Sequence, residues 1–201
     1  FWNAPLDVKD HRVQSIRCGQ KMFRLLDELN KEVMNEGLDE LKIGVGINTG
    51  EVVVGNMGSE QRFDYTCLGD AVNLSSRLEG QTKEYKVGII LGQNTVKGIE
   101  SAFNFVELDK IAVKGKKEGV RIFTILDDVS RCANGGDVQH HNTFLTYYRA
   151  QRWDDALKVI ELNKITYPEL SEYYEMMGDR INHLKEDEPG EDWDTIFRAT
   201  S

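Results

Sequence analysis

The sequence lacks the features of secreted, membrane-spanning and zinc-binding proteins. Its three cysteines, Cys18, Cys67 and Cys132, are widely spaced and form no Cys-x-x-Cys or Cys/His pattern, which favours reduced thiols. No apolar run approaches the roughly 18 residues of a membrane span, and no secretion signal opens the chain. We therefore expect a cytoplasmic location, with any membrane anchor upstream of this chain.

Positive charge is also scarce. The chain has 25 Lys and Arg against 34 Asp and Glu, a net charge of −9, so it repels nucleic-acid backbones. Hydrophobic residues make up 40% and charged residues 29%, as in folded soluble domains. Among four histidines only His140 and His141 are adjacent. On a helix they would point about 100° apart, so we expect surface positions rather than a shared metal ion.

Hydrophobic periodicity predicts the elements of the first half of the chain. Apolar residues at helical spacing predict a long helix from Asp7 to Gly37, with its stripe facing a core. The alternating runs 43–47 and 52–54, split by a Gly-containing turn, predict a hairpin. A third alternating run, 63–68, predicts another strand.

The next elements complete an α+β or α/β arrangement. A helix is predicted from Asp70 to about Lys83, with Asp70 as its N-cap. Strands are predicted at 87–91, 103–108 and 120–126, the last two forming a hairpin. This order predicts helices packed on a mostly antiparallel sheet.

A Gly-rich segment around residues 130–137 marks a domain boundary between residues 1–129 and a tail at 138–201. The tail's apolar spacing predicts a helix pair and a third helix. A single helix pair cannot bury its own face, so we expect a packed appendage rather than a solenoid. Its aromatic residues indicate a core rather than a ligand cage, and they are Tyr147, Tyr148, Trp153, Tyr173 and Tyr174.

The glycines between residues 44 and 58 do not form a phosphate-binding loop. Neither the dinucleotide fingerprint nor GxxxxGK[ST] is present, and the glycines lie between strands rather than before a helix. Tight turns and close backbone approach explain them better.

Asn73 and Arg77 are the strongest candidates for chemistry. Their spacing places them on one face of the helix, beside the apolar stripe of Ala71, Leu74 and Leu78. An arginine fork stabilises developing phosphate charge, and an amide orients a neighbouring sugar oxygen. Spacing alone, however, favours an ordinary solvated helix face.

Three ordered motifs change that balance. They are GINTGEVVVGNMGS at 46–59, Thr66-x-Leu-Gly-Asp-Ala-Val-Asn73-x-x-x-Arg77, and Val-Lys-Gly-Lys at 113–116. Over residues 1–128 they resemble the catalytic domain of class III adenylate and guanylate cyclases of bacterial type. The resemblance implies an α+β fold, a ferredoxin-like cyclase sheet with helices packed on it and its first strands missing, followed by an α-helical tail. The tail is similar to the extension of some bacterial adenylate cyclases.

The resemblance also assigns roles to residues. It implies that Asn73 orients the ribose and reacting phosphate, and that Arg77 stabilises the transition state. Lys114 would bind the outgoing phosphates, and Val72 belongs to the substrate-binding set. Thr66 falls where adenylate cyclases read adenine.

Adenine is favoured because guanylate cyclases commonly carry Cys at the position of Thr66. Here the cysteine is Cys67, which strand alternation turns to the opposite face. The expected reaction converts ATP to cyclic AMP and pyrophosphate, in cyclic AMP signalling. A guanylate cyclase and a silent regulatory or interaction module remain alternatives. Retention of Asn73, Arg77 and Lys114 argues against the silent module.

The resemblance implies two Mg²⁺ or Mn²⁺ ions held by two Asp residues, which we expect in strands before Phe1. Asp64 and Asp70 fall at other family positions. The family's active sites lie between two chains arranged head to tail, one supplying the carboxylates and the other the Asn and Arg. We therefore expect a head-to-tail homodimer in the parent enzyme. This chain alone should bind no metal and be inactive.

Overall fold

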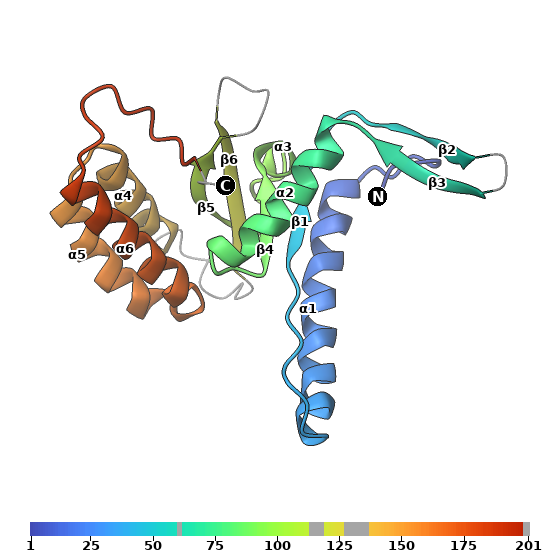
Figure 1. The fold of residues 1–201 in the computed structure, drawn as a ribbon, viewed down its shortest axis with the longest axis horizontal. Coiled ribbons are helices and arrows are strands. Elements are labelled where there is room, and N and C mark those ends of the chain that lie inside the picture. Colours follow the sequence, from blue (N-terminus) through green and yellow to red (C-terminus); the bar gives the residue numbers. More distant parts are fainter. Residues whose placement is uncertain (60–61, 113–118, 127–136, 199–201) are drawn as a thin grey trace. The chain divides into compact units, whose positions relative to one another are not determined.

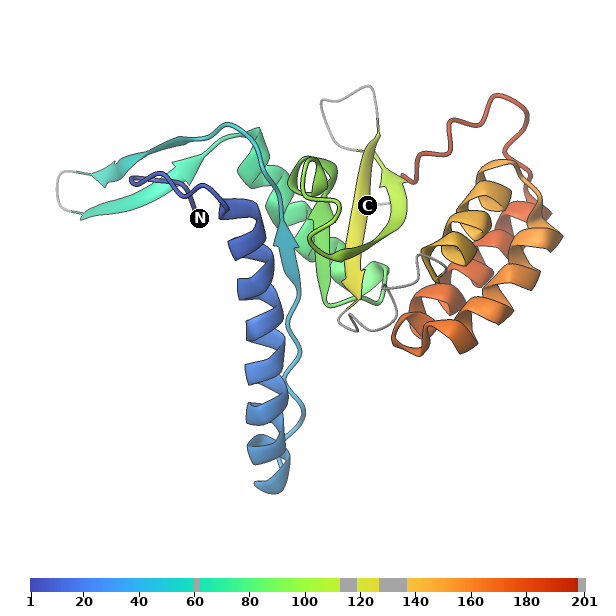
Figure 2. The same ribbon diagram turned by 180° about the vertical axis from the view of Figure 1, so that it is seen from behind.

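The computed structural model of the chain describes residues 1–59, 62–112, 119–126 and 137–198. It divides into two compact units (Figures 1 and 2). The first unit contains Phe1–Lys83 and Gly88–Ala102, and the second contains Glu84–Val87 and Phe103–Ser201. The predicted boundary at residues 130–137 lies almost entirely outside the described residues.

The first unit contains four strands, two whole helices, and a third helix without its last residue. In chain order they are α1 (His11–Asn35), β1 (Val45–Ile47), β2 (Val53–Ser59), β3 (Arg62–Leu68), α2 (Asp70–Glu84), β4 (Ile89–Gly92) and α3 (Gln93–Val96). The second unit holds a strand pair and the tail. Its elements are β5 (Asn104–Ile111), β6 (Val120–Leu126), α4 (Asp137–Arg149), α5 (Trp153–Thr166), the 3₁₀ turn η2 (Pro168–Leu170) and α6 (Ser171–Glu186).

Strand pairing confirms the α+β class and corrects one hairpin. β2 pairs with β3, and β5 with β6, both antiparallel. β1 instead pairs with β4 in parallel, with Val45 opposite Ile89. The predicted hairpin between runs 43–47 and 52–54 is therefore wrong. Local alternation shows that a run is extended, but it does not choose the partner strand.

Helix α1 begins at His11, four residues later than predicted, and ends two residues before Gly37. Its first half faces the parallel strand pair. Ile16 is fully buried, and a Cβ atom at Gly19 would lie 3.4 Å from the Ile89 side chain. This half of the helix has the predicted core face.

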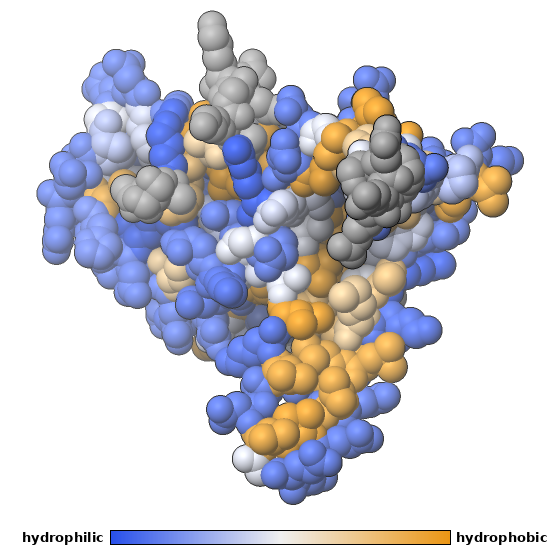
Figure 3. Space-filling model, turned by 45° about the vertical axis from the view of Figure 1, so that its right-hand side comes forward, coloured by the Kyte–Doolittle hydropathy of each residue, from blue (hydrophilic) through white to orange (hydrophobic). Residues whose placement is uncertain are grey.

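The second half of α1 buries the predicted stripe only in part, because Phe23, Leu26 and Val33 are half-buried whereas Leu29 is exposed. Leu25 is 53% exposed, Leu29 44% and Met34 61%. Figure 3 shows this apolar surface over the end of α1 and the segment that follows it. The buried Asn30 side chain both donates to and accepts from the Leu41 backbone, and thus ties that segment back along the helix. Periodicity shows that one face is apolar, but it does not show what covers that face.

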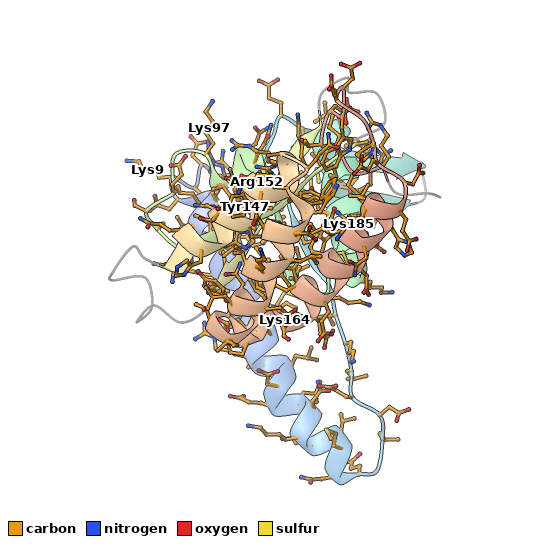
Figure 4. The ribbon with its side chains drawn as sticks, turned by 90° about the vertical axis from the view of Figure 1, so that its left-hand side faces the viewer. Lys9, Lys97, Tyr147, Arg152, Lys164 and Lys185 are labelled. Carbon is orange, nitrogen blue, oxygen red and sulfur yellow. The ribbon has the colours of Figure 1, made fainter. Side chains whose placement is uncertain are left out.

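The tail helices bury an aromatic core, as predicted. Tyr148, Trp153, Tyr173 and Tyr174 are all buried. Tyr147 differs, because it lies near the surface beneath the Arg152 guanidinium, 4.3 Å from ring centroid to Cζ (Figure 4). This pair is a surface cation–π contact. No helix in the described ranges has the length and apolar character of a membrane span.

After α6 the chain forms a strap, residues 187–198, that returns to β5 (Figure 1). Trp193 packs 5.3 Å from Tyr148 and 5.7 Å from Trp153, centroid to centroid. The Phe197 amide donates to the Lys110 carbonyl at 2.8 Å, and the Ala112 amide donates to the Phe197 carbonyl at 2.9 Å. The strap therefore adds a backbone bridge to β5.

His141 corrects the predicted surface position of the histidine pair. His140 is exposed, whereas His141 is fully buried. Its Nε2 lies 2.6 Å from the Glu107 carbonyl, and its Nδ1 lies 2.8 Å from the Tyr174 hydroxyl. A carbonyl only accepts, so Nε2 carries the proton and Nδ1 of the neutral ring accepts from Tyr174. From the sequence, the two adjacent rings are expected to point in different directions on a helix. The sequence does not show which of them faces the interior.

Burial lowers the pKa of His141 from 6.5 to about 4. The unfolded chain therefore binds more protons than the folded chain between these values, and stability falls as pH drops through this window. We expect a loss on the order of 3 kcal/mol in the free energy of unfolding from pH 6.5 to 4 through this residue.

Denaturant unfolding of the wild type and the His141→Gln and His140→Gln variants across pH 4–7 measures this contribution. In the His141→Gln variant, the free energy of unfolding should fall less between pH 6.5 and 4, by that amount. The His140→Gln variant should show the same fall as the wild type. Equal slopes in all three proteins would contradict the assignment.

Candidate functional site

Helix α2 presents Asn73 and Arg77 to solvent. Its buried face consists of Leu74, Leu78 and Thr82, each no more than 5% exposed. Asn73 and Arg77 lie beside that face and are exposed, as the sequence predicted. One helical turn separates them, so their side chains reach the same region. Neither side chain has a hydrogen-bonding or ionic partner within the described ranges, which leaves both available to a ligand.

The start of α2 is set by Gly69. Its φ of +150° is a conformation that L side chains rarely adopt, and its carbonyl accepts from the amides of Val72 at 3.0 Å and Asn73 at 3.2 Å. Asp70 is the first helical residue, so its prediction as N-cap is wrong by one position. Glycine suits the cap because other residues rarely adopt that backbone conformation. Asp70 stabilises the first turn through its charge.

The segment between β1 and β2 is held against the first turn of α2. The Asn48 amide donates to the Ala71 carbonyl at 3.0 Å. The Thr49 and Thr95 hydroxyls are 3.1 Å apart, which links this segment to α3. A Cβ atom at Gly50 would lie 2.7 Å from that of Ala71. These contacts fix the turn of the helix that carries Val72 and Asn73.

Further along, α2 packs directly on strand β1. The Ser75 hydroxyl donates to the Gly46 carbonyl at 2.8 Å. A Cβ atom at Gly46 would overlap the backbone of Ser75 and Glu79. Gly46 and Gly50 thus serve close backbone approach, which confirms that interpretation at these two positions. Asn48 and Ser75 are positioning residues that sequence reasoning missed, although both fall inside the recognised motifs.

Thr66 lies on β3, the strand that leads into α2. It pairs with Gly55 of β2 and is half-buried, and Cys67 beside it pairs with Val54. Alternation turns Thr66 and Cys67 to opposite faces of the hairpin. The half-buried Val72 sits with Asn73 in the first turns of α2. Lys114 lies outside the described residues.

Carboxylates do not gather near these residues. In the described part of the chain, no three His, Cys, Asp or Glu side chains come together in a way that could hold a metal ion. Asp64 and Asp70 are both exposed, on β3 and at the start of α2. Within the described residues, Asn73 and Arg77 thus place an amide and a cation on one helix face without a cluster of metal-binding side chains beside them.

Comparison with known proteins identifies the family of the chain. Residues 4–127 match the model of the adenylate and guanylate cyclase catalytic domain. The chain therefore belongs to the family of adenylate and guanylate cyclase catalytic domains.

Curated relatives include the terminal-differentiation adenylate cyclase of Dictyostelium discoideum, 32% identical over 78% of this chain and 8% of that protein. Adenylate cyclase 1 of Rhizobium meliloti is 32% identical over 63% and 19%, respectively. The adenylate cyclase of Anabaena cylindrica is 36% identical over 55% and 23%. The chain thus spans less than a quarter of the length of these curated relatives.

Similar solved structures include a guanylyl cyclase and an adenylyl cyclase. The guanylyl cyclase Cya2 is 35% identical with a TM-score of 0.53, over 61% of each chain. The adenylyl cyclase CyaB from P. aeruginosa is 32% identical with a TM-score of 0.57, over 62% of this chain and 64% of that one. These likenesses confirm the cyclase type of fold.

The contact between Gly46 and α2 gives a stability prediction. Gly46→Ala should lower the free energy of unfolding by about 1–3 kcal/mol, because the new methyl group would force α2 away from β1. Gly80→Ala, in the same helix and facing open space, should raise it by up to about 1 kcal/mol. Urea unfolding of both variants tests the packing. Equal stability of the two would show that α2 does not pack on β1 this closely.

Proposed function

We propose that this chain carries the transition-state half of an adenylate cyclase site. The observation that carries the proposal is the exposed, unpartnered pair Asn73 and Arg77 on one face of α2, within the region that matches the family. In the proposed reaction the ribose 3′-oxygen of ATP bonds to the α-phosphorus and the bond to pyrophosphate breaks. The hydroxyl proton is released, and cyclic AMP forms.

Each residue has a role in this proposal. The Arg77 guanidinium stabilises charge on the phosphoryl oxygens as the pentavalent arrangement forms. Asn73, one turn earlier, orients the ribose for in-line attack. Val72 lines the substrate site, Thr66 reads the base, and Lys114 binds the outgoing phosphates. The segment at Asn48 and the Ser75 hydroxyl keep α2 in place.

The metal ions would come to the site from elsewhere. The resemblance implies Mg²⁺ or Mn²⁺, and the described residues of this chain do not fit such ions. We propose that a second polypeptide in a head-to-tail homodimer supplies the carboxylates, and that the active site lies at their interface. This chain by itself is then inactive.

The base specificity rests on Thr66. A threonine hydroxyl both donates and accepts, so it suits the amino group of adenine. The curated relatives of Dictyostelium discoideum, Rhizobium meliloti and Anabaena cylindrica are all named adenylate cyclases. Guanylate cyclase is the second candidate, favoured by the 35% identity to the guanylyl cyclase Cya2.

A mixing experiment tests the shared site. The 201-residue chain is combined with a longer form of the protein that holds a complete cyclase domain and carries Arg77→Ala. Cyclic AMP formation from ATP with Mn²⁺ should appear only in the mixture. Replacing Arg77 by Ala in both partners should lower the rate about 10²–10³-fold, as loss of an oxyanion-stabilising donor does.

Lys83→Ala is the matched control for Arg77→Ala, because Lys83 is also an exposed cation on α2. It should leave the rate of the mixture unchanged. Cyclic AMP formation by the 201-residue chain alone would contradict the divided site. A silent mixture in which ultracentrifugation shows the mixed dimer would contradict the role of Arg77.

The proposed base contact predicts a change of nucleotide preference. In the mixture, Thr66→Cys should raise the ratio of GTP to ATP turnover about tenfold, because a thiol is a weak partner for the adenine amino group. Cys67→Ala alters the neighbouring position on the opposite face and should leave the ratio unchanged. An equal effect of both variants would show that Thr66 does not contact the base.

A further inference from the structure

A buried ion pair lies in the second unit. Asp109 of β5 and Arg180 of α6 are 2.5 Å apart, Oδ2 to Nη1, with side chains 2% and 12% exposed. Burying two charges is costly unless further groups satisfy them. The Lys110 amide donates to the other Asp109 oxygen at 2.7 Å, and the Arg180 guanidinium stacks on Phe197, 3.8 Å from Cζ to ring centroid. The pair therefore joins β5, α6 and the strap.

A third residue shares the same carboxylate oxygen. The Tyr85 hydroxyl donates to Asp109 Oδ2 at 2.7 Å, and the Tyr85 side chain is fully buried. Arg180 Cζ lies 5.3 Å from the Tyr85 ring centroid. Burial, reinforced by the Asp109 charge, raises the pKa of Tyr85 above its usual range, so the phenol stays protonated and donates.

The strand itself is shaped for this contact. The β5–β6 register shifts between Glu107 and Asp109, which marks a β-bulge at Leu108. A bulge re-aims the side chains that follow it. Glu107 pairs with Arg149 of α4 at 2.6 Å, whereas Asp109 pairs with Arg180. Two acids of one strand thus bind two tail helices separately, and only Asp109 also binds Tyr85.

The hydrogen bond between Tyr85 and Asp109 lies next to the C-terminal end of α2. Tyr85 directly follows Glu84, the last residue of α2. Residues 84–87 group with the unit that contains the tail. Helix α2 is continuous from Asp70 to Glu84, so a contact made by the residue after Glu84 restrains the last turn of the helix. The tail thereby holds the end of the helix on which Asn73 and Arg77 lie.

We propose that Tyr85, Asp109 and Arg180 are positioning residues through which the C-terminal tail anchors the last turn of α2, the helix that carries Asn73 and Arg77. The catalytic part of this inference rests on the proposed function, whereas the restraint of α2 does not. The tail then acts as a brace of the last turn of α2, with Arg180 as its contact residue.

Amide hydrogen exchange of the full 201-residue chain tests the restraint. Tyr85→Phe and Arg180→Met should speed exchange at residues 78–84 of α2 about tenfold, because each loses a buried hydrogen bond at the helix exit. Arg149→Met is the matched control, since it breaks the other tail-to-β5 ion pair without touching Tyr85. It should leave α2 exchange unchanged.

Unchanged exchange in Tyr85→Phe, or equal acceleration in all three variants, would overturn the inference. Tyr85→Phe keeps the ring and removes only the hydroxyl. It therefore tests the restraint of α2 even if Arg180→Met fails to fold.

Kinetics in the mixing assay then test the catalytic consequence. Tyr85→Phe should lower kcat about fivefold at constant KM for ATP, because the misplaced Arg77 acts in the transition state. An equal change in the Arg149→Met control would indicate a general loss of structure and overturn the positioning role. If the wild-type mixture is silent although ultracentrifugation shows the mixed dimer, while α2 exchange responds as expected, the proposed function fails and the brace stands.

Discussion

The direct packing of α2 on β1 is the constraint on which the rest of the first unit depends. Gly46 has no side chain, so the backbone of α2 can approach β1 closely. The hydrogen bond from the Ser75 hydroxyl to the Gly46 carbonyl then holds the helix on the strand. Leu74 and Leu78 are thereby buried, and Asn73 and Arg77 must face solvent. The exposure of the two site residues is thus a consequence of how the opposite face of their helix packs.

Polar contacts hold α2 at both of its ends. Asn48 binds its first turn through Ala71, and Tyr85, just past its last turn, binds Asp109. The second contact depends on the tail, because Arg180 neutralises the buried Asp109. The tail thus contacts a strand of the region that matches the family. It shares a compact unit with the β5–β6 pair that the family match includes.

The sequence predicted the elements better than their partners. Helices α2, α4, α5 and α6 and strands β3 and β6 follow from periodicity, because each presents a clear apolar face. The pairing of β1 with β4 was missed, since a parallel partner lies more than forty residues away and leaves no local signal. The burial of His141 was missed for a similar reason, because its partners come from β5 and α6.

By itself, the sequence determined the cyclase family and the one-turn spacing of Asn73 and Arg77, because ordered motifs and helical geometry are local properties. Only the tertiary structure decided what those residues depend on. It brought Gly46 against α2, left the apolar face of the second half of α1 only partly covered, and joined Tyr85, Asp109 and Arg180. Such contacts link residues far apart in the chain, and their energies come from burial that no local pattern records.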